Sequence, residues 1–190
     1  MSFTPWSVIR DLWLLILVVW LVGALRAKPA VRRQPLRQQL LQRALTITAW
    51  VLLLVPAMAV GPLGRRFVAP GAGVAWTGVA VTAIGIAIAF WARATLGGNW
   101  SANVTVKASH QLVVHGPYAY VRHPIYSGLS LAIAGTALAV GEVRGVLALA
   151  VVLLAWRVKW PAEERFMVEQ FGDGYRDYRR RVKALIPGVW

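Results

Sequence analysis

The sequence predicts an all-α integral membrane protein, a helical bundle of about five transmembrane helices with a helical tail at the C-terminus. Of the 190 residues, 58% are hydrophobic and only 15% are charged, and the mean hydropathy is +0.57. A chain this apolar has too much hydrophobic surface for a water-soluble core. The alternation typical of a barrel strand is absent, and a segment in lipid must satisfy its own backbone hydrogen bonds, so the membrane segments are expected to be helices.

Apolar segments of 14 to 19 residues alternate with polar stretches along the chain. A helix that crosses a bilayer needs about 20 residues, so the shorter segments must include neighbouring residues, or the last two must pair as a hairpin that does not cross fully. Pro56 lies inside the second segment and is expected to kink it. The five segments are 12–25, 44–60, 74–92, 125–140 and 145–160.

Basic residues are distributed unevenly between the predicted loops. If all five segments cross, 17 of the 21 Lys and Arg residues fall on one face of the membrane and four on the other. The positive-inside rule makes the richer face cytoplasmic, which places the loop 93–124 and the tail after residue 160 together on that side. This bias and the attraction to anionic headgroups explain the net charge of +14, so membrane lipids and not nucleic acid are the expected partners.

Small residues recur at helical spacing in the third and fourth segments. Such stripes allow two helices to approach closely, so each of these segments is expected to pack tightly against a neighbour. The stripes are Gly78, Thr82, Gly85 and Ala89 in one segment, and Gly128, Ala132, Gly135 and Ala139 in the other.

The loop 93–124 is long for a connection within a bundle, which favours a functional role. It contains all three histidines of the chain, His110, His115 and His123. No cysteine is present anywhere, and no carboxylate lies nearby in the loop. Because a metal site would need such ligands, no metal is expected here.

The tail supplies the acidic groups that the loop lacks. Five of the seven acidic residues follow position 160, and Glu163 and Glu164 come just after Pro161, which can restart or kink the last helix. Helical spacing places Trp156 and Glu163 near one face. Two interpretations are open. The glutamates and the loop 93–124 form one site, or Glu164 forms an ion pair with Arg157 and the tryptophans form an interfacial belt.

Seven short blocks of polar, aromatic and glycine residues follow one another between residues 93 and 187. They are Leu96 and Gly97 with Asn99, Trp100 and Ser101; His110, Gln111 and Leu112; Gly116, Pro117 and Tyr118; Arg122, His123 and Pro124 with Tyr126 and Gly128; Glu163 and Glu164; Phe171 and Gly172 with Tyr175 and Tyr178; and Ile186 and Pro187.

In this order the blocks resemble the isoprenylcysteine carboxyl methyltransferase family of integral membrane enzymes. The resemblance implies one membrane domain, in which residues 1–92 supply N-terminal transmembrane helices and residues 93–190 form the catalytic core. It also implies that S-adenosylmethionine binds in a cytoplasmic pocket between the loop and the tail, and that a lipophilic acceptor enters from the bilayer. The richness in Ala, Val and Arg favours a bacterial chain, and hence the inner membrane.

The resemblance also implies roles for individual residues. Arg122 and Glu164 are the candidate catalytic residues, with Arg122 holding a carboxylate of the acceptor or of the cofactor. One glutamate of the pair is expected to accept hydrogen bonds from the cofactor, and Glu163 is the candidate. The other candidate cofactor-binding residues are His110, Gln111, Leu112, Gly116, Pro117, Tyr118, His123, Pro124 and Tyr126, and the candidate substrate-binding residues are Asn99, Trp100 and Trp156.

Other interpretations stay open at this stage. Four classes of methyl acceptor are compatible with the sequence: an isoprenoid thioether acid, a small thiol, a phospholipid amine and another lipid. The Arg122 block with its tyrosines also resembles the C-terminal part of membrane sterol reductases that use NADPH, although the short chain and the glutamate pair disfavour them. A membrane-binding protein without catalytic activity would leave the polar cluster unexplained.

Overall fold

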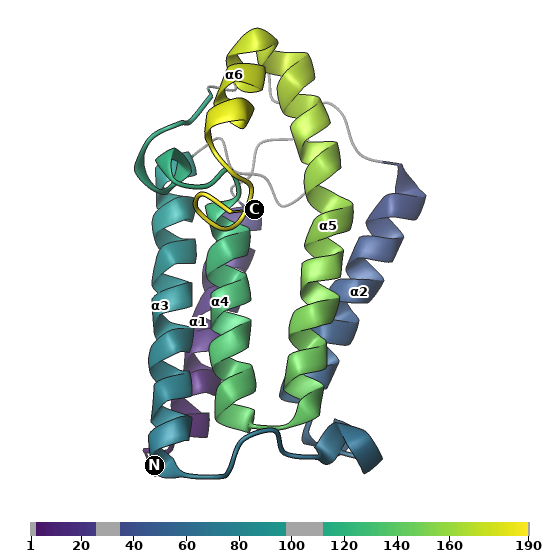
Figure 1. Ribbon diagram of the computed structural model, residues 1–190, viewed down its shortest axis with the longest axis vertical. Coiled ribbons are helices and arrows are strands. Elements are labelled where there is room, and N and C mark those ends of the chain that lie inside the picture. The colour runs from purple at the N-terminus through teal and green to yellow at the C-terminus, as the bar shows by residue number, and fades with distance from the viewer. Residues whose placement is uncertain (1–2, 26–34, 98–111, 190) are drawn as a thin grey trace.

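The computed structural model describes residues 3–25, 35–97 and 112–189, and over these ranges the protein is a bundle of antiparallel helices (Figure 1). The long helices run alternately up and down the view, and the short α6 lies at the end where α3 and α5 finish and α4 begins. The predicted all-helical fold and helical tail are thus confirmed. The helices are α1 (Pro5–Leu25), α2 (Leu36–Leu54), α3 (Ala72–Leu96), α4 (Pro124–Val140), α5 (Val143–Phe171) and α6 (Asp173–Arg181), with short 3-10 turns η1 (Pro56–Met58), η2 (Gly61–Gly64) and η4 (Gly116–Ala119).

Within the described ranges, three helices are long and apolar enough to cross a membrane. They are α1, over Pro5–Ala24, α3 and α5. Helix α4 is apolar but has only 17 residues, and α2 carries Arg37 and Arg43 in its first half. The described residues therefore contain three candidate membrane spans and one shorter apolar helix, and the predicted number of crossings stays a prediction.

Two prolines mark where the observed helices differ from the predicted segments. Helix α2 ends at Leu54, so Pro56 does not kink it but opens η1. Proline disfavours helical dihedrals in the residue before it, and Val55 is accordingly extended, with φ −92° and ψ 109°. Pro161 by contrast lies inside α5, which continues to Phe171 and carries the two glutamates beyond the predicted apolar segment.

The closest helix packing joins α3 and α4, which lie side by side in Figure 1. A Cβ atom added at Gly78 would lie 2.6 Å from the carbonyl oxygen of Gly135, and one added at Gly128 would lie 2.6 Å from that of Gly85. The two stripes of small residues thus face each other, which confirms the predicted close packing and identifies the partner of each stripe.

A buried arginine ties α5 to α2 at the end of the bundle opposite α6. Arg144 Nη1 donates to the carbonyl oxygens of Leu52 at 2.9 Å, Leu53 at 3.1 Å and Val55 at 3.3 Å. Its Nε donates to Glu142 Oε2 at 2.5 Å. The guanidinium therefore satisfies the Leu52 and Leu53 carbonyls in the last turn of α2, which have no partner further along the helix, and it sets the register of α2 along α5.

Replacing Gly85 by Val is expected to destabilise the bundle by about 1–3 kcal/mol, because the new side chain forces α3 and α4 apart. A Cβ atom at Gly85 would lie 2.5 Å from Gly128 O. Thermal unfolding in detergent measures the effect. The control is Gly73→Val on the same helix, where nothing lies within 4 Å of the added Cβ; equal melting temperatures for the two variants would contradict the expectation.

Candidate active site

The segment before α4 and the tail after α6 join through backbone hydrogen bonds. The amides of Arg122 and His123 donate to the carbonyl oxygens of Lys183 at 2.8 Å and Ala184 at 3.0 Å. The Ser127 hydroxyl, in the first turn of α4, donates to Leu185 O at 2.6 Å. The segment before α4 and the tail, which the sequence predicts to share one side of the membrane, therefore form one structural unit.

Arg122 and Glu164 form an almost buried ion pair at this junction. Arg122 Nε and Nη2 lie 2.8 and 2.7 Å from Glu164 Oε1, and the two side chains are only 11% and 9% exposed. Arg122 Nη1 donates to the carbonyl oxygens of Val182 and, at 3.3 Å, Arg179. The same guanidinium thus holds α5 and the tail, while Arg179 Nη1 lies 3.7 Å from Glu164 Oε2.

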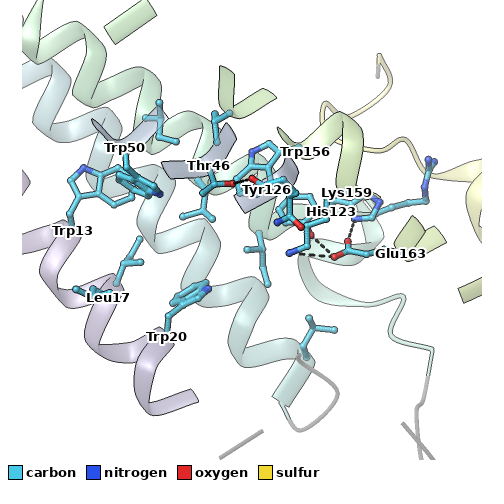
Figure 2. A pocket seen from close by; sticks show the side chains of 18 of the residues that line it. Trp13, Leu17, Trp20, Thr46, Trp50, His123, Tyr126, Trp156, Lys159 and Glu163 are labelled. Atoms are coloured by element: carbon cyan, nitrogen blue, oxygen red, sulfur yellow. Dashed lines mark hydrogen bonds and ion pairs between the residues drawn. The ribbon is translucent and has the colours of Figure 1, made fainter. Parts of the chain in front are cut away.

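The neighbouring Glu163 is the centre of a second polar group, which Figure 2 shows from close by. Its Oε1 accepts a hydrogen bond from the Tyr126 hydroxyl at 2.5 Å and lies 3.6 Å from Lys159 Nζ. The ring of His123 lies between the two glutamates, with Nδ1 3.6 Å from Glu163 Oε2 and Nε2 3.2 Å from Glu164 Oε1. Both carboxylates are therefore held in fixed positions by cations and hydrogen-bond donors.

Aromatic rings stack beside the carboxylates. Tyr126 stacks on Trp156 with ring centroids 4.5 Å apart, and His123 stacks between Tyr126 at 5.4 Å and Trp160 at 6.0 Å. Lys159 Nζ lies 5.3 Å from the centroid of the Tyr126 ring. Aromatic rings next to carboxylates suit a ligand that carries a positive charge together with an aromatic ring or hydroxyl groups. The rings contact the cation or the aromatic ring, and the carboxylates accept hydrogen bonds from the hydroxyl groups.

Three tyrosines outside the membrane helices enclose the polar group as neutral phenols. Burial raises the pKa of Tyr118, Tyr175 and Tyr178 above that of a free tyrosine. Glu163 adds to the rise in pKa at Tyr118, and Glu164 adds to it at Tyr175. The Tyr178 hydroxyl donates to Tyr118 O at 2.6 Å, so α6 is held against η4.

One continuous cavity of about 900 Å³ extends from this polar group along the inside of the bundle. Its polar end is lined by residues that include Arg122, His123, Tyr126, Lys159 and Glu163. The remainder lies between α1, α2 and α4 and is lined mainly by apolar side chains. The volume is at the upper end of the usual range for a small-molecule site, about 300–1,000 Å³.

The candidate residues identified from sequence fall into three groups. Leu112, Tyr118, Arg122, His123, Tyr126, Trp156 and Glu163 line the cavity. Gly116 and Pro117 form the η4 turn, Pro124 starts α4, and Glu164 reaches the site through Arg122 and His123. The candidates Asn99, Trp100, His110 and Gln111 lie outside the described residues. In the described part of the chain, no group of three or more His, Cys, Asp or Glu side chains is placed to hold a metal ion.

Several lining residues were not among the candidates. Lys159 carries a positive charge next to Glu163, and its four-residue spacing from that glutamate on a helix was a usable signal. Helices α1 and α2 had no motif, so their contribution was missed. The main unpredicted lining residues are Trp13, Leu17, Trp20, Thr46, Trp50, Phe166 and Met167.

Comparisons with known proteins identify relatives of this chain. A family model described as phospholipid methyltransferase matches residues 74–174. A protein-S-isoprenylcysteine O-methyltransferase of Schizosaccharomyces pombe is 40% identical over 81 residues, which cover 41% of this chain and 34% of that protein. Methanethiol S-methyltransferase 1 of Bradyrhizobium diazoefficiens is 41% identical over 71 residues, which cover 37% of this chain and 24% of that protein. The match therefore spans about a third or less of each of these two relatives.

A solved structure shares the fold. The structure of the eukaryotic intramembrane Ras methyltransferase ICMT superposes with a TM-score of 0.54 at 24% sequence identity, over 77% of this chain and 52% of that one. This likeness establishes the arrangement of helices, while the chemistry has to be argued from the side chains described above.

Replacing Glu164 by Gln is expected to release the tail, because Arg122 loses its anionic partner and the link between α5 and residues 179–184 weakens. The expected loss in the free energy that holds the tail closed is about 1–3 kcal/mol, the usual contribution of hydrogen bonds to a charged group. Limited trypsin digestion reports it, since cleavage at Arg179, Arg180 and Arg181 should become faster as the tail opens more often. Asp177→Asn is the control, because Asp177 pairs with Arg180 on the exposed face of α6; equally fast cleavage of both variants would exclude the proposed link.

Proposed function

This chain belongs to the phospholipid methyltransferase family, whose model matches residues 74–174, and we propose that it is a membrane enzyme that transfers a methyl group from S-adenosylmethionine to a lipophilic acceptor. The observation that carries the proposal is the cavity: its end at Glu163 holds a carboxylate and stacked aromatic rings, and the rest lies between the membrane helices and is mainly apolar, with Arg10, Gln42 and Thr46 as its polar lining residues. Such a cavity accommodates a polar cation and a hydrocarbon chain next to each other.

The polar end fits the chemistry of the cofactor, which supplies an electrophilic methyl group on a sulfonium when it is bound. Glu163 is a carboxylate that lines the cavity and is suited to accept hydrogen bonds from ribose hydroxyls or an ammonium group. The parts of the Tyr126 and Trp156 rings that line the cavity are suited to contact a sulfonium or an adenine ring, and a cation over an aromatic ring contributes about 0.5–2 kcal/mol. Tyr118, Tyr175 and Tyr178 close this end towards the tail.

Few catalytic groups are needed for such a transfer. An in-line displacement requires that donor and nucleophile be aligned and that water be excluded. A carboxylate acceptor is already an anion at neutral pH, so it needs no general base. The packing of η4 and α6 over the polar end supplies the exclusion of water.

Within this proposal Arg122 and Lys159 have different roles. Arg122 directs Nε and Nη2 to Glu164 and Nη1 to backbone carbonyls, so it positions the tail and the glutamate pair. Lys159 lies next to Glu163 and lines the cavity, which makes it the cation suited to an anionic head of the acceptor. Glu164 is then a positioning residue for Arg122 and His123.

The acceptor that we propose is an amphiphile with a small reacting head, an isoprenylcysteine-like carboxylate or a related lipid or thiol. The names of the relatives include both an isoprenylcysteine O-methyltransferase and a methanethiol S-methyltransferase, so the head group is the variable part. The apolar length of the cavity favours an acceptor with a hydrocarbon chain over a small thiol. The proposed location is the bacterial inner membrane, with the polar end on the cytoplasmic side.

S-adenosylhomocysteine is expected to raise the melting temperature of the detergent-solubilised protein in a concentration-dependent manner, because it binds only the folded state. Glu163→Gln should weaken this binding about tenfold, the loss of one hydrogen bond to a charged acceptor. Asp177→Asn on the exposed face of α6 is the matched control. Stabilisation by NADPH and not by S-adenosylhomocysteine would instead identify a reductase.

Arg122→Ala is expected to lower turnover about a hundredfold with a lipophilic acceptor, because the misplacement of groups around the reacting atoms is costly. His115→Ala should retain nearly full turnover, since His115 is exposed and does not line the cavity. Transfer of a radiolabelled methyl group, measured below the melting temperature of both variants, makes the comparison. Equal rates for the two variants would contradict the role assigned to Arg122.

A further inference from the structure

Two tryptophans meet across the cavity, well away from its polar end. Trp13 of α1 and Trp50 of α2 contact edge to face, with ring centroids 4.5 Å apart and ring planes at 85°, a geometry that aromatic pairs favour. Both line the cavity, and Figure 2 shows them together at the opposite side of the view from Glu163. We call this pair the Trp crossbar.

The Trp crossbar is anchored to the most closely packed part of the bundle. The Trp13 indole nitrogen donates to Thr136 Oγ1 on α4 at 3.1 Å, and that hydroxyl lies 3.2 Å from Thr82 Oγ1 on α3. Trp13 and both threonines are buried. Because three helices hold it, Trp13 is a fixed wall, and Trp50, which is half-buried, rests against it.

The position of Thr136 indicates how far the Trp crossbar lies from the polar end. Tyr126 and Thr136 are ten residues apart on α4, which corresponds to about 15 Å along a helix. Between these levels the cavity is lined by Leu129 and Ile133 of α4 and by Leu17 of α1. Beyond Trp13 its lining continues along α1 to Ile9 and Trp6.

This lining determines the chemistry of the occupant. Between Glu163 and the Trp crossbar, which we call the inner part of the cavity, the charged side chains lie at the polar end. A molecule whose head reacts at that end must therefore place its remainder against the apolar side chains between the polar end and the Trp crossbar. Since the cavity is continuous from Glu163 to Trp50, that remainder is a hydrocarbon chain directed at the Trp crossbar. A chain that is too long meets two aromatic rings that the surrounding helices hold in place.

We propose that the Trp crossbar sets the maximum length of the hydrocarbon chain that the acceptor can carry. This inference rests on the proposed function, because the acceptor is the molecule whose chain it measures. Trp50 is the residue that determines specificity, since the Trp crossbar narrows the cavity and removal of the Trp50 ring widens it towards the part along Ile9 and Trp6. Trp13 acts with it as the fixed wall.

The test measures binding and methyl transfer for S-prenylcysteines with one to four isoprene units, in protein reconstituted in lipid nanodiscs. For the wild-type protein we expect the affinity to rise with chain length and then fall. Trp50→Ala should move the fall to longer chains and improve kcat/KM for the longest acceptor relative to a short one by about tenfold, a typical discrimination by hydrophobic fit. Trp50→Phe retains an aromatic ring and should show a smaller shift.

Two further variants keep the test decisive. Trp76→Ala removes an exposed tryptophan of α3 that does not line the cavity, and it should leave the length profile unchanged. Trp13→Phe replaces the indole of the fixed wall by a smaller aromatic ring and should shift the length profile in the same direction as Trp50→Ala. This variant tests the inference even if Trp50→Ala does not fold.

The outcomes separate this inference from the proposed function. A wild-type length limit in binding that Trp50→Ala relaxes supports the Trp crossbar, and if no methyl group is transferred to any acceptor, the proposed function alone fails. An unchanged length profile in folded Trp50→Ala and Trp13→Phe overturns the inference, and the apolar part of the cavity is then a place for ordinary membrane lipids. A wild-type protein that binds all lengths equally overturns it as well.

Discussion

The ion pair between Arg122 and Glu164 joins the parts of the chain that make up the polar end of the cavity. A carboxylate that leaves water needs a cation and hydrogen-bond donors to compensate, and Glu164 has Arg122 and His123. The other donors of the same guanidinium reach the carbonyls of Arg179 and Val182. This buried charge pair, together with the backbone hydrogen bonds to Lys183 and Ala184, therefore places the tail and through it the tyrosines that enclose Glu163.

The α3 and α4 pair is the rigid support for this junction. Backbone atoms of the two helices approach so closely at Gly78, Gly85, Gly128 and Gly135 that no side chain would fit between them. Tyr126 lies in the first turn of α4, and Arg122 and His123 directly precede this helix. The close packing of α3 and α4 therefore fixes their position along the bundle axis. Arg144 does the same for α2 and α5 at the other end.

Local patterns in the sequence predicted more of the fold than of the cavity. Hydropathy located the apolar helices, and the spacing of small residues predicted that α3 and α4 each pack closely against a neighbour. The polar blocks indicated most residues of the polar end. Pro56 was misinterpreted because a proline at the edge of an apolar run ends a helix as readily as it kinks one. The lining of α1 and α2 was missed, since Trp13 and Thr46 acquire their meaning only from helices far away in the sequence.

The cavity divides along the sequence. The residues at the polar end of the cavity lie between Leu112 and Tyr178, largely inside the region matched by the family model. Helices α1 and α2 precede that region and line the apolar part of the cavity. Under the proposed function, the matched region supplies the reacting end, and α1 and α2 supply much of the wall for the hydrocarbon chain. Under the proposed function, evolution can alter α1 and α2, and with them the range of accepted lipids, while the residues of the polar end stay in place, and a chimera that exchanges only these two helices is a practical route to a new selectivity.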